Sequence, residues 1–257
     1  MTPDSVQANE PEVRFDRVTK VFERAGGGET FRAVDELSLD IGSGGLVALL
    51  GQTGCGKSTM FNMIAGLLDP TEGRVTVRGR DPFREFDWFR GRIAVVFQND
   101  RLLPWRTALG NVELGLEMLG RTPQERRETA QRWLSQLGLG GHEDDYPHAL
   151  SGGMRQRVSI ARAFATDAGL LLCDEPFSAL DEITGQRLRE EFVSLVRTSN
   201  KTAVFITHSI NEALQIGDRI VVLKRPAKIA YDVELPADLD DADEVAIRAR
   251  ILEVLSA

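Results

Sequence analysis

The segment GQTGCGKST, residues 51–59, combines the residue types and the spacing of a phosphate-binding loop. It follows the apolar run LVALL and leads into the run STMFNMIAGLL, which predicts a strand, a glycine-rich loop and a helix in succession. Glycines let backbone N–H groups converge on phosphate oxygens, and the start of the helix adds partial positive charge. We expect Lys57 to bridge the β- and γ-phosphates of a nucleoside triphosphate, Ser58 to ligate Mg²⁺ and Thr59 to contact the α-phosphate. The remaining positions of the loop are Gly51, Gln52, Thr53, Gly54, Cys55 and Gly56.

Two adjacent carboxylates, Asp174 and Glu175, follow the apolar run LLLC. An apolar run of this kind predicts a strand buried on both faces, and ligands of open α/β sheets bind beyond the carboxyl ends of such strands. We therefore expect Asp174 to hold Mg²⁺ through its water shell and Glu175 to polarise an attacking water. A single acid at this place commonly caps a turn, but two acids in a chain with a phosphate loop favour hydrolysis.

A second glycine pair opens a second helix in LSGGMRQR, residues 150–157. The free N–H groups at a helix start suit an anion, although a serine–glycine pair by itself usually only caps the helix. The triphosphate of one bound nucleotide needs only one such anion-binding turn. The turn formed by Ser151, Gly152 and Gly153 is therefore expected to cover the γ-phosphate held by a second copy of the chain, arranged head to tail.

Short apolar runs alternate with helical patterns, which predicts an α/β core with a mostly parallel sheet. The first strands alternate in polarity and predict an antiparallel edge sheet. We expect one domain over 13–257, with a core of 13–98 and 151–235, a helical subdomain at 99–150 and a C-terminal helix within 236–257. Residues 1–12 are expected to form a disordered tail. The expected strands are 13–22, 33–41, 46–50, 73–77, 92–98, 170–175, 203–208 and 219–224.

The composition is that of a soluble globular protein, with 42% hydrophobic and 27% charged residues among 257. A formal net charge of -8 does not favour nonspecific binding to nucleic acid. Two cysteines predict no disulfide framework and a reducing compartment. The polar N-terminus is not a signal peptide, and no apolar stretch approaches the roughly 20 residues that span a bilayer.

Five motifs follow one another in the order GQTGCGKST, VFQNDRLLPW, LSGGMRQR, LLLCDEPFSALD and FITH. In this order they resemble the ATP-binding cassette (ABC) ATPase family across residues 13–235, and LLPW with LSGGM is most similar to the nitrate, sulfonate and taurine importer cassettes. The resemblance implies a P-loop NTPase core, a mostly parallel sheet with helices on both faces, together with an antiparallel β edge sheet and an inserted α-helical subdomain. It implies ATP and Mg²⁺ as cofactors.

The resemblance also implies roles for residues that no local pattern assigns. Gln98 matches the glutamine that contacts Mg²⁺ and the attacking water and senses the membrane subunit. His208 matches the histidine that holds the γ-phosphate and orients Glu175. Asp181 ends the SALD segment that links the two sites of a dimer, and Phe22 matches the aromatic residue that stacks on adenine.

Three departures from the family pattern are visible. Met154 replaces the commoner glutamine of the signature, and Gln52–Thr53 replaces the frequent Pro–Ser pair of the phosphate loop. Ser209 stands where the family more often has an acid, so the contact that supports His208 is expected to differ.

The resemblance implies partners as well. These are a second ABC ATPase subunit, most simply an identical copy, transmembrane permease subunits and, indirectly, an extracytoplasmic solute-binding protein. The chain would lie at the cytoplasmic face of the inner membrane as a peripheral subunit, with no nucleic acid. The segment DRLLPW offers apolar contacts for a short permease helix through Leu102, Leu103, Pro104 and Trp105, unless the subdomain buries them.

The sequence alone is also compatible with other functions of an ABC ATPase. An ABC exporter subunit is the nearest alternative to an importer, and a soluble non-transport ABC ATPase is a further one. Chromosome-maintenance cassettes carry a long coiled coil between the phosphate loop and the signature, which 99–150 lacks. Translation-factor cassettes carry two cassettes in one chain, whereas this sequence contains one set of the motifs. A non-catalytic scaffold is disfavoured because both Glu175 and His208 are present.

Overall fold

The structure is a computed structural model that describes residues 10–23, 29–236 and 238–256. The chain divides into two compact units. The first unit comprises the chain up to Trp88 and from Thr202 onward, and the second comprises Phe89–Lys201. Most of the expected tail, residues 1–9, lies outside the described residues. Glu12, the last residue of the expected tail, is part of the folded unit, because it is buried and its carboxylate accepts a hydrogen bond from Arg78 Nε at 2.8 Å.

An antiparallel sheet in the first unit is formed by β1 (Val13–Glu23), β2 (Thr30–Ile41) and β4 (Glu72–Val77) in the order β2-β1-β4. Apolar residues such as Phe15 and Leu39 are buried on one face, and charged residues alternate with them. This arrangement confirms the edge sheet that the alternating sequence predicts.

Three parallel strands form the centre of the first unit, with β3 (Leu46–Gly51) between β7 (Thr202–Thr207) and β8 (Arg219–Lys224). Every residue of β3 and β7 is buried, as their apolar sequences predict. The strand β9 (Lys228–Glu234) runs antiparallel to β8. The strand β9 is not among the expected strands; it has no fully buried residue, and its half-buried apolar residues alternate with exposed ones.

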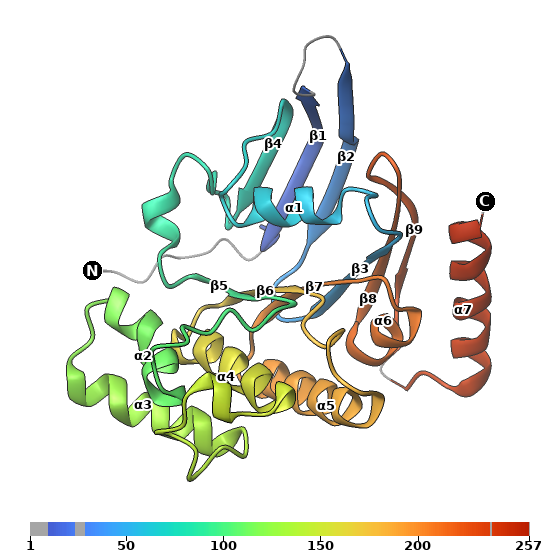
Figure 1. Cartoon of the computed structure of the whole chain (residues 1–257). Helices are drawn as coiled ribbons and strands as arrows, with labels where there is room; N and C mark the ends of the chain where they lie inside the picture. Colours follow the sequence, from blue (N-terminus) through green and yellow to red (C-terminus); the bar gives the residue numbers. More distant parts are fainter. Residues whose placement is uncertain (1–9, 24–28, 237, 257) are drawn as a thin grey trace. The chain divides into compact units, whose positions relative to one another are not determined.

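The helices of the first unit each come after a strand. They are α1 (Lys57–Ile64) after β3, α6 (Ile210–Ile216) after β7, and α7 (Asp241–Ser256) after β9. A short 3-10 turn lies at Phe86–Phe89. Figure 1 shows α7 in red beside the β8–β9 pair and α6, and its Ile251 is fully buried there.

The second unit contains two parallel strands, β5 (Ile93–Val96) and β6 (Leu170–Asp174), and four helices. The helices are α2 (Ala108–Met118), α3 (Pro123–Gln136), α4 (Gly152–Ala165) and α5 (Glu182–Thr198), with a 3-10 turn at Pro147–Ala149. Residues 99–150, all of them described, contain α2 and α3 and no strand. A buried aromatic cluster joins α4 to α5, where the Phe164 and Phe192 rings meet edge to face at 5.9 Å.

Candidate nucleotide-binding and hydrolysis site

The phosphate loop leaves the carboxyl end of β3 and turns directly into α1. Gly56, which caps α1, has φ of 112°, a value that side chains rarely allow. A Cβ at this position would lie 2.5 Å from the carbonyl oxygen of Ala33 and 2.7 Å from the Cβ of Ala227. Only glycine permits this approach, so the loop is packed tightly onto β2 and the β8–β9 turn.

Lys57, the first residue of α1, is buried and lies along the loop. Its Nζ donates to the carbonyl oxygens of Gly51 at 2.6 Å and Gln52 at 3.1 Å. These bonds hold the ammonium group at the loop, where it can neutralise phosphate charge. Cys55 is buried in the same loop.

A cavity of about 280 Å³ opens beside the loop and is lined by Lys57, Ser58 and Thr59. Two residues that sequence reasoning missed line the same cavity. They are Phe31 on β2 and Arg225 in the β8–β9 turn, and the Arg225 guanidinium lies 4.9 Å from the centre of the Phe31 ring. The predicted adenine-stacking residue, Phe22, is the cross-strand partner of Phe31.

Phe22 is 37% exposed, and Lys20 Nζ lies 5.3 Å from the centre of its ring. Directly opposed residues of an antiparallel pair share a face of the sheet, so Phe22 lies on the same face as Phe31, which lines the cavity beside the loop. That position suits a nucleobase whose phosphates occupy the loop. An aromatic residue at the start of the second strand is the signal that could have revealed Phe31.

The position of Arg225 leads to a first prediction. Arg225→Ala should weaken binding of a fluorescent ATP analogue by about three- to tenfold, because a charge-assisted contact beside the phosphates is lost. Fluorescence titration measures the dissociation constant. The control is Arg14→Ala, which removes an exposed arginine bonded to Asp40 in the antiparallel sheet. Equal affinities for wild type and Arg225→Ala would contradict a role for Arg225 at the nucleotide.

His208 lies directly after β7 and is exposed. Thr207 is the register partner of Leu50 on β3, so His208 and the phosphate loop leave the same edge of the first unit's parallel strands. Ser209 caps α6 by accepting from the Glu212 N–H at 3.3 Å, and the Thr207 hydroxyl donates to the Glu212 carboxylate at 2.5 Å. Ser209 thus fixes the turn that carries His208, where the family more often has an acid.

In the second unit, Gln98 follows β5, Asp174 is the last residue of β6, and Glu175 comes directly after it. Val96 and Cys173 are register partners in this parallel pair, so the predicted glutamine and the two carboxylates leave the same strand edge. The predicted catalytic side chains of the second unit are thereby brought together. Burial raises the pKa of the Cys173 thiol far above its usual range, which fits a core residue.

Glu175 has a left-handed backbone, with φ of 45°. Residues other than glycine adopt this region at a cost of about 1–3 kcal/mol, and such strain is concentrated at functional sites. The turn is held by Ser178, whose backbone N–H and hydroxyl donate to the Glu175 carbonyl at 3.2 and 3.0 Å. Sequence reasoning identified Glu175 but not this conformation.

The signature turn, formed by Ser151, Gly152 and Gly153, begins α4, as the sequence predicts. Ser151 is the N-cap, and its hydroxyl oxygen accepts from the Met154 N–H at 3.3 Å. Asp181 caps α5 in the same way, and bonds from Thr184 lower the pKa of its carboxyl. A Cβ at Gly153 would lie 3.0 Å from Thr184 Cγ2, so the starts of α4 and α5 are neighbours.

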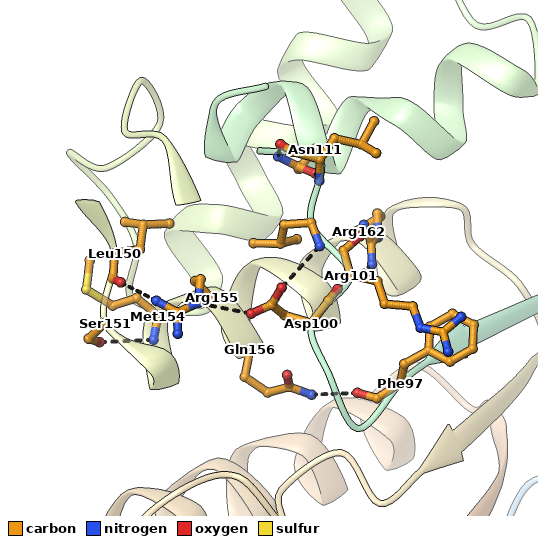
Figure 2. A network of polar contacts seen from close by, with 12 residues as sticks. Phe97, Asp100, Arg101, Asn111, Leu150, Ser151, Met154, Arg155, Gln156 and Arg162 are labelled. Atoms are coloured by element: carbon orange, nitrogen blue, oxygen red, sulfur yellow. Dashed lines mark hydrogen bonds and ion pairs between the residues drawn. The ribbon is translucent and has the colours of Figure 1, made fainter. Parts of the chain in front are cut away.

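The loop after Gln98 is fastened to α4 by a polar network (Figure 2). Arg155 donates to the Asp100 carboxylate at 3.0 Å and to the Leu150 carbonyl at 2.7 Å. Arg162 donates to the carbonyls of Asp100 and Arg101, at 2.8 and 2.9 Å. Sequence reasoning missed these residues. Because of them, the loop and the signature turn are tied to the same helix.

The donor types predicted for magnesium are those that Mg²⁺ takes together with a nucleotide. Ser58 lines the cavity of the first unit, and Gln98 and Asp174 share the strand edge of the second. Mg²⁺ is commonly held by one or two carboxylates together with substrate phosphates. A hydroxyl, an amide and one carboxylate match that pattern. Nowhere in the described ranges do three His, Cys, Asp or Glu residues gather as metal ligands, so a site made only of such residues is not seen there.

Residues 34–178 match the family model described as ABC transporter, and the chain belongs to this family. An uncharacterized ABC transporter ATP-binding protein of Methanocaldococcus jannaschii is 41% identical over 95% of this chain and 91% of its own length. The taurine import ATP-binding protein TauB of Rhizobium johnstonii is 45% identical over 84% of this chain and 81% of its own length. The nitrate import ATP-binding protein NrtC of Synechococcus elongatus is 42% identical over 81% of this chain, which spans only 31% of NrtC.

A solved dimeric ATP-binding cassette in a post-hydrolysis state, bound to ADP and Pi, superposes with a TM-score of 0.77. It is 36% identical, over 88% of this chain and 99% of its own length. These matches confirm the P-loop NTPase fold class. The chain is an ATP-binding ABC ATPase similar to the nitrate and taurine cassettes, and it hydrolyses ATP in a reaction coupled to transport. None of the helices in the described part of the chain has the length and apolarity to cross a bilayer.

Proposed function

We propose that this ABC ATPase drives the import of a small anionic solute of the nitrate, sulfonate or taurine class. Two copies would enclose two MgATP and dock, at the cytoplasmic face of the membrane, on a separate permease served by a solute-binding protein. The observation that carries the proposal is the 45% identity to a taurine import ATP-binding protein over 84% of the chain. The dimeric state of the similar solved cassette supports the pairing.

The reaction is an in-line attack of water on the γ-phosphate, for which the protein supplies positioning and electrostatic stabilisation. Lys57 and the N–H groups of the phosphate loop bind the β- and γ-phosphates. Glu175 accepts a hydrogen bond from the attacking water and orients it, while His208 donates a hydrogen bond to the γ-phosphate. Bound Mg²⁺, held by Ser58, Gln98 and Asp174, would neutralise charge on the β- and γ-oxygens.

The signature turn would act on the partner's nucleotide. Ser151 and Gly152 are exposed at the start of α4, where free N–H groups face solvent. Such a helix start binds phosphate oxygens. Closing the dimer places this start on the γ-phosphate held by the other copy, and loss of that phosphate on hydrolysis releases it.

Docking on the permease is assigned to the segment after Gln98. Trp105 is 71% exposed and Pro104 is exposed beside it, whereas Leu102 is buried and Leu103 is half-buried with its N–H bonded to Asn111. The contact surface is therefore smaller than the four residues predicted from the sequence. Since the network of Figure 2 ties this segment to α4, movement of a docked helix reaches the signature turn.

Affinity purification from detergent-solubilised membranes of the source cells tests the proposal. We expect the tagged chain to recover a polytopic permease, and vesicles containing that complex to take up taurine, an alkanesulfonate or nitrate when the matching solute-binding protein and ATP are supplied. Trp105→Ser should reduce permease recovery at least threefold. Met118→Ser, which changes a similarly exposed apolar residue of the same unit, should not. Outward transport without a solute-binding protein would instead identify an exporter.

A further inference from the structure

The helix α7 touches the phosphate loop through a side-chain hydrogen bond. Gln52 Nε2 donates to the carbonyl oxygen of Leu255 at 3.0 Å. Leu255 lies in the last turn of α7, where carbonyl groups have no partner within the helix. Gln52 is also the loop position where this chain departs from the family's frequent proline. The matched family region, 34–178, does not include α7.

Apolar packing places α7 directly against the strand that leads into the loop. Ile251 and Val254 of α7 are buried in a cluster with Ala48 and Leu50 of β3. Leu255 packs against the same cluster. The phosphate loop begins one residue after Leu50, so the last turn of α7 contacts both the end of β3 and the loop itself.

The middle of α7 contacts the helix that follows His208. Arg248 donates to the side-chain oxygen of Asn211, in the first turn of α6, and to Glu244 at 2.7 Å. Ala213 and Leu214 of α6 belong to the same apolar cluster as Ile251. Asn211 lies three residues after His208, and Ser209, which caps α6, lies between them.

We propose that α7 is a positioning element of the ATPase: Gln52 anchors the phosphate loop to its last turn, and Arg248 anchors the start of α6 to its middle. The inference rests on the proposed roles of the phosphate loop and His208. One rigid helix then sets the spacing between the group that binds the phosphates and the group that contacts the γ-phosphate. Gln52 and Arg248 are positioning residues and need not touch the nucleotide.

The two anchors predict different kinetic effects. Gln52→Ala frees the loop, so the dissociation constants for ATP and ADP should both rise about two- to tenfold, the effect of one lost hydrogen bond. Arg248→Leu keeps an apolar stem but frees α6, so kcat should fall by a similar factor while the ADP dissociation constant is unchanged. Arg250→Leu is the matched control, because the Arg250 side chain bonds to Glu253 on the same helix at 2.5 Å.

If α7 only stabilises the fold, the same variants are expected to behave differently. Both variants would then lower the melting temperature at least as much as Arg250→Leu does. The KM, the kcat and the ADP affinity per folded molecule would stay at wild-type values. That outcome overturns the inference. If wild type itself neither binds ATP analogues nor hydrolyses ATP, the proposed site fails instead, so the two failures are distinguishable.

A double-mutant cycle separates anchoring from direct contact of Gln52 with the nucleotide. Val254→Gly frays the last turn of α7 and displaces the Leu255 carbonyl. If Gln52 acts through α7, then Gln52→Ala has little further effect on ADP affinity in the Val254→Gly background. If the two effects multiply, Gln52 acts independently of α7 and the inference is wrong.

Discussion

Glu175→Gln is expected to leave ATP binding at the wild-type level and to lower kcat for ATP hydrolysis by about 10²–10⁴-fold, the usual contribution of a positioned acid–base group. The amide has the same shape as the carboxylate but cannot accept the proton of the attacking water. The strained turn is preserved, because Ser178 bonds to the backbone carbonyl of residue 175 and not to its side chain. Phosphate release measures turnover, and a fluorescent ATP analogue measures binding.

Glu190→Gln is the matched control for that substitution, since Glu190 lies exposed on α5 and accepts from Gln186 at 3.2 Å. It should hydrolyse ATP like wild type. The Glu175→Gln variant should also accumulate as an ATP-bound dimer, because the γ-phosphate that holds the two copies together is not removed. Turnover close to wild type in this variant would exclude Glu175 from the hydrolytic step.

The parts of the site that are contiguous in the chain could be predicted from the sequence. The phosphate loop and the Asp174–Glu175 pair each follow an apolar run, and the helix start at Ser151 carries its own cap and glycines. In these cases the local sequence indicates the chemistry and the adjoining elements, although not the left-handed backbone of Glu175. The strand ends were placed within a few residues for the same reason, since apolar runs in a buried sheet end where the polar loop begins.

The parts that depend on pairing between distant segments could not be predicted. Arg225 reaches the phosphate cavity only because β8 pairs with β3 in the register that sets Leu223 beside Gly51. The Asp100–Arg155 ion pair joins residues 55 positions apart. The strand β9 has no fully buried residue, and its half-buried Ile229, Tyr231 and Val233 form only a short alternation that becomes a strand by pairing with β8.

Gly152→Asp is expected to abolish cooperative ATP hydrolysis while leaving the fold intact. A Cβ at this position lies no closer than 3.8 Å to a neighbouring atom, that of Arg155 Nη2. An acid in the first turn also favours the helix, because it opposes the positive end of the α4 dipole. The same negative charge repels the γ-phosphate held by a partner copy. Nucleotide binding to the variant's own phosphate loop should therefore stay at the wild-type level.

Mixing two inactive variants tests whether the signature turn acts on the partner's nucleotide. Lys57→Met lacks the ammonium that binds phosphates, and Gly152→Asp lacks a usable signature turn, so each homodimer should be inactive. In a mixed dimer, one site combines both defects, whereas the other combines an intact loop with an intact turn. Random pairing of equal amounts should restore up to about a quarter of wild-type turnover. If mixed dimers form, as shown by cross-linking of differently tagged copies, and turnover still does not recover, then the signature turn does not complete the site of a neighbouring copy.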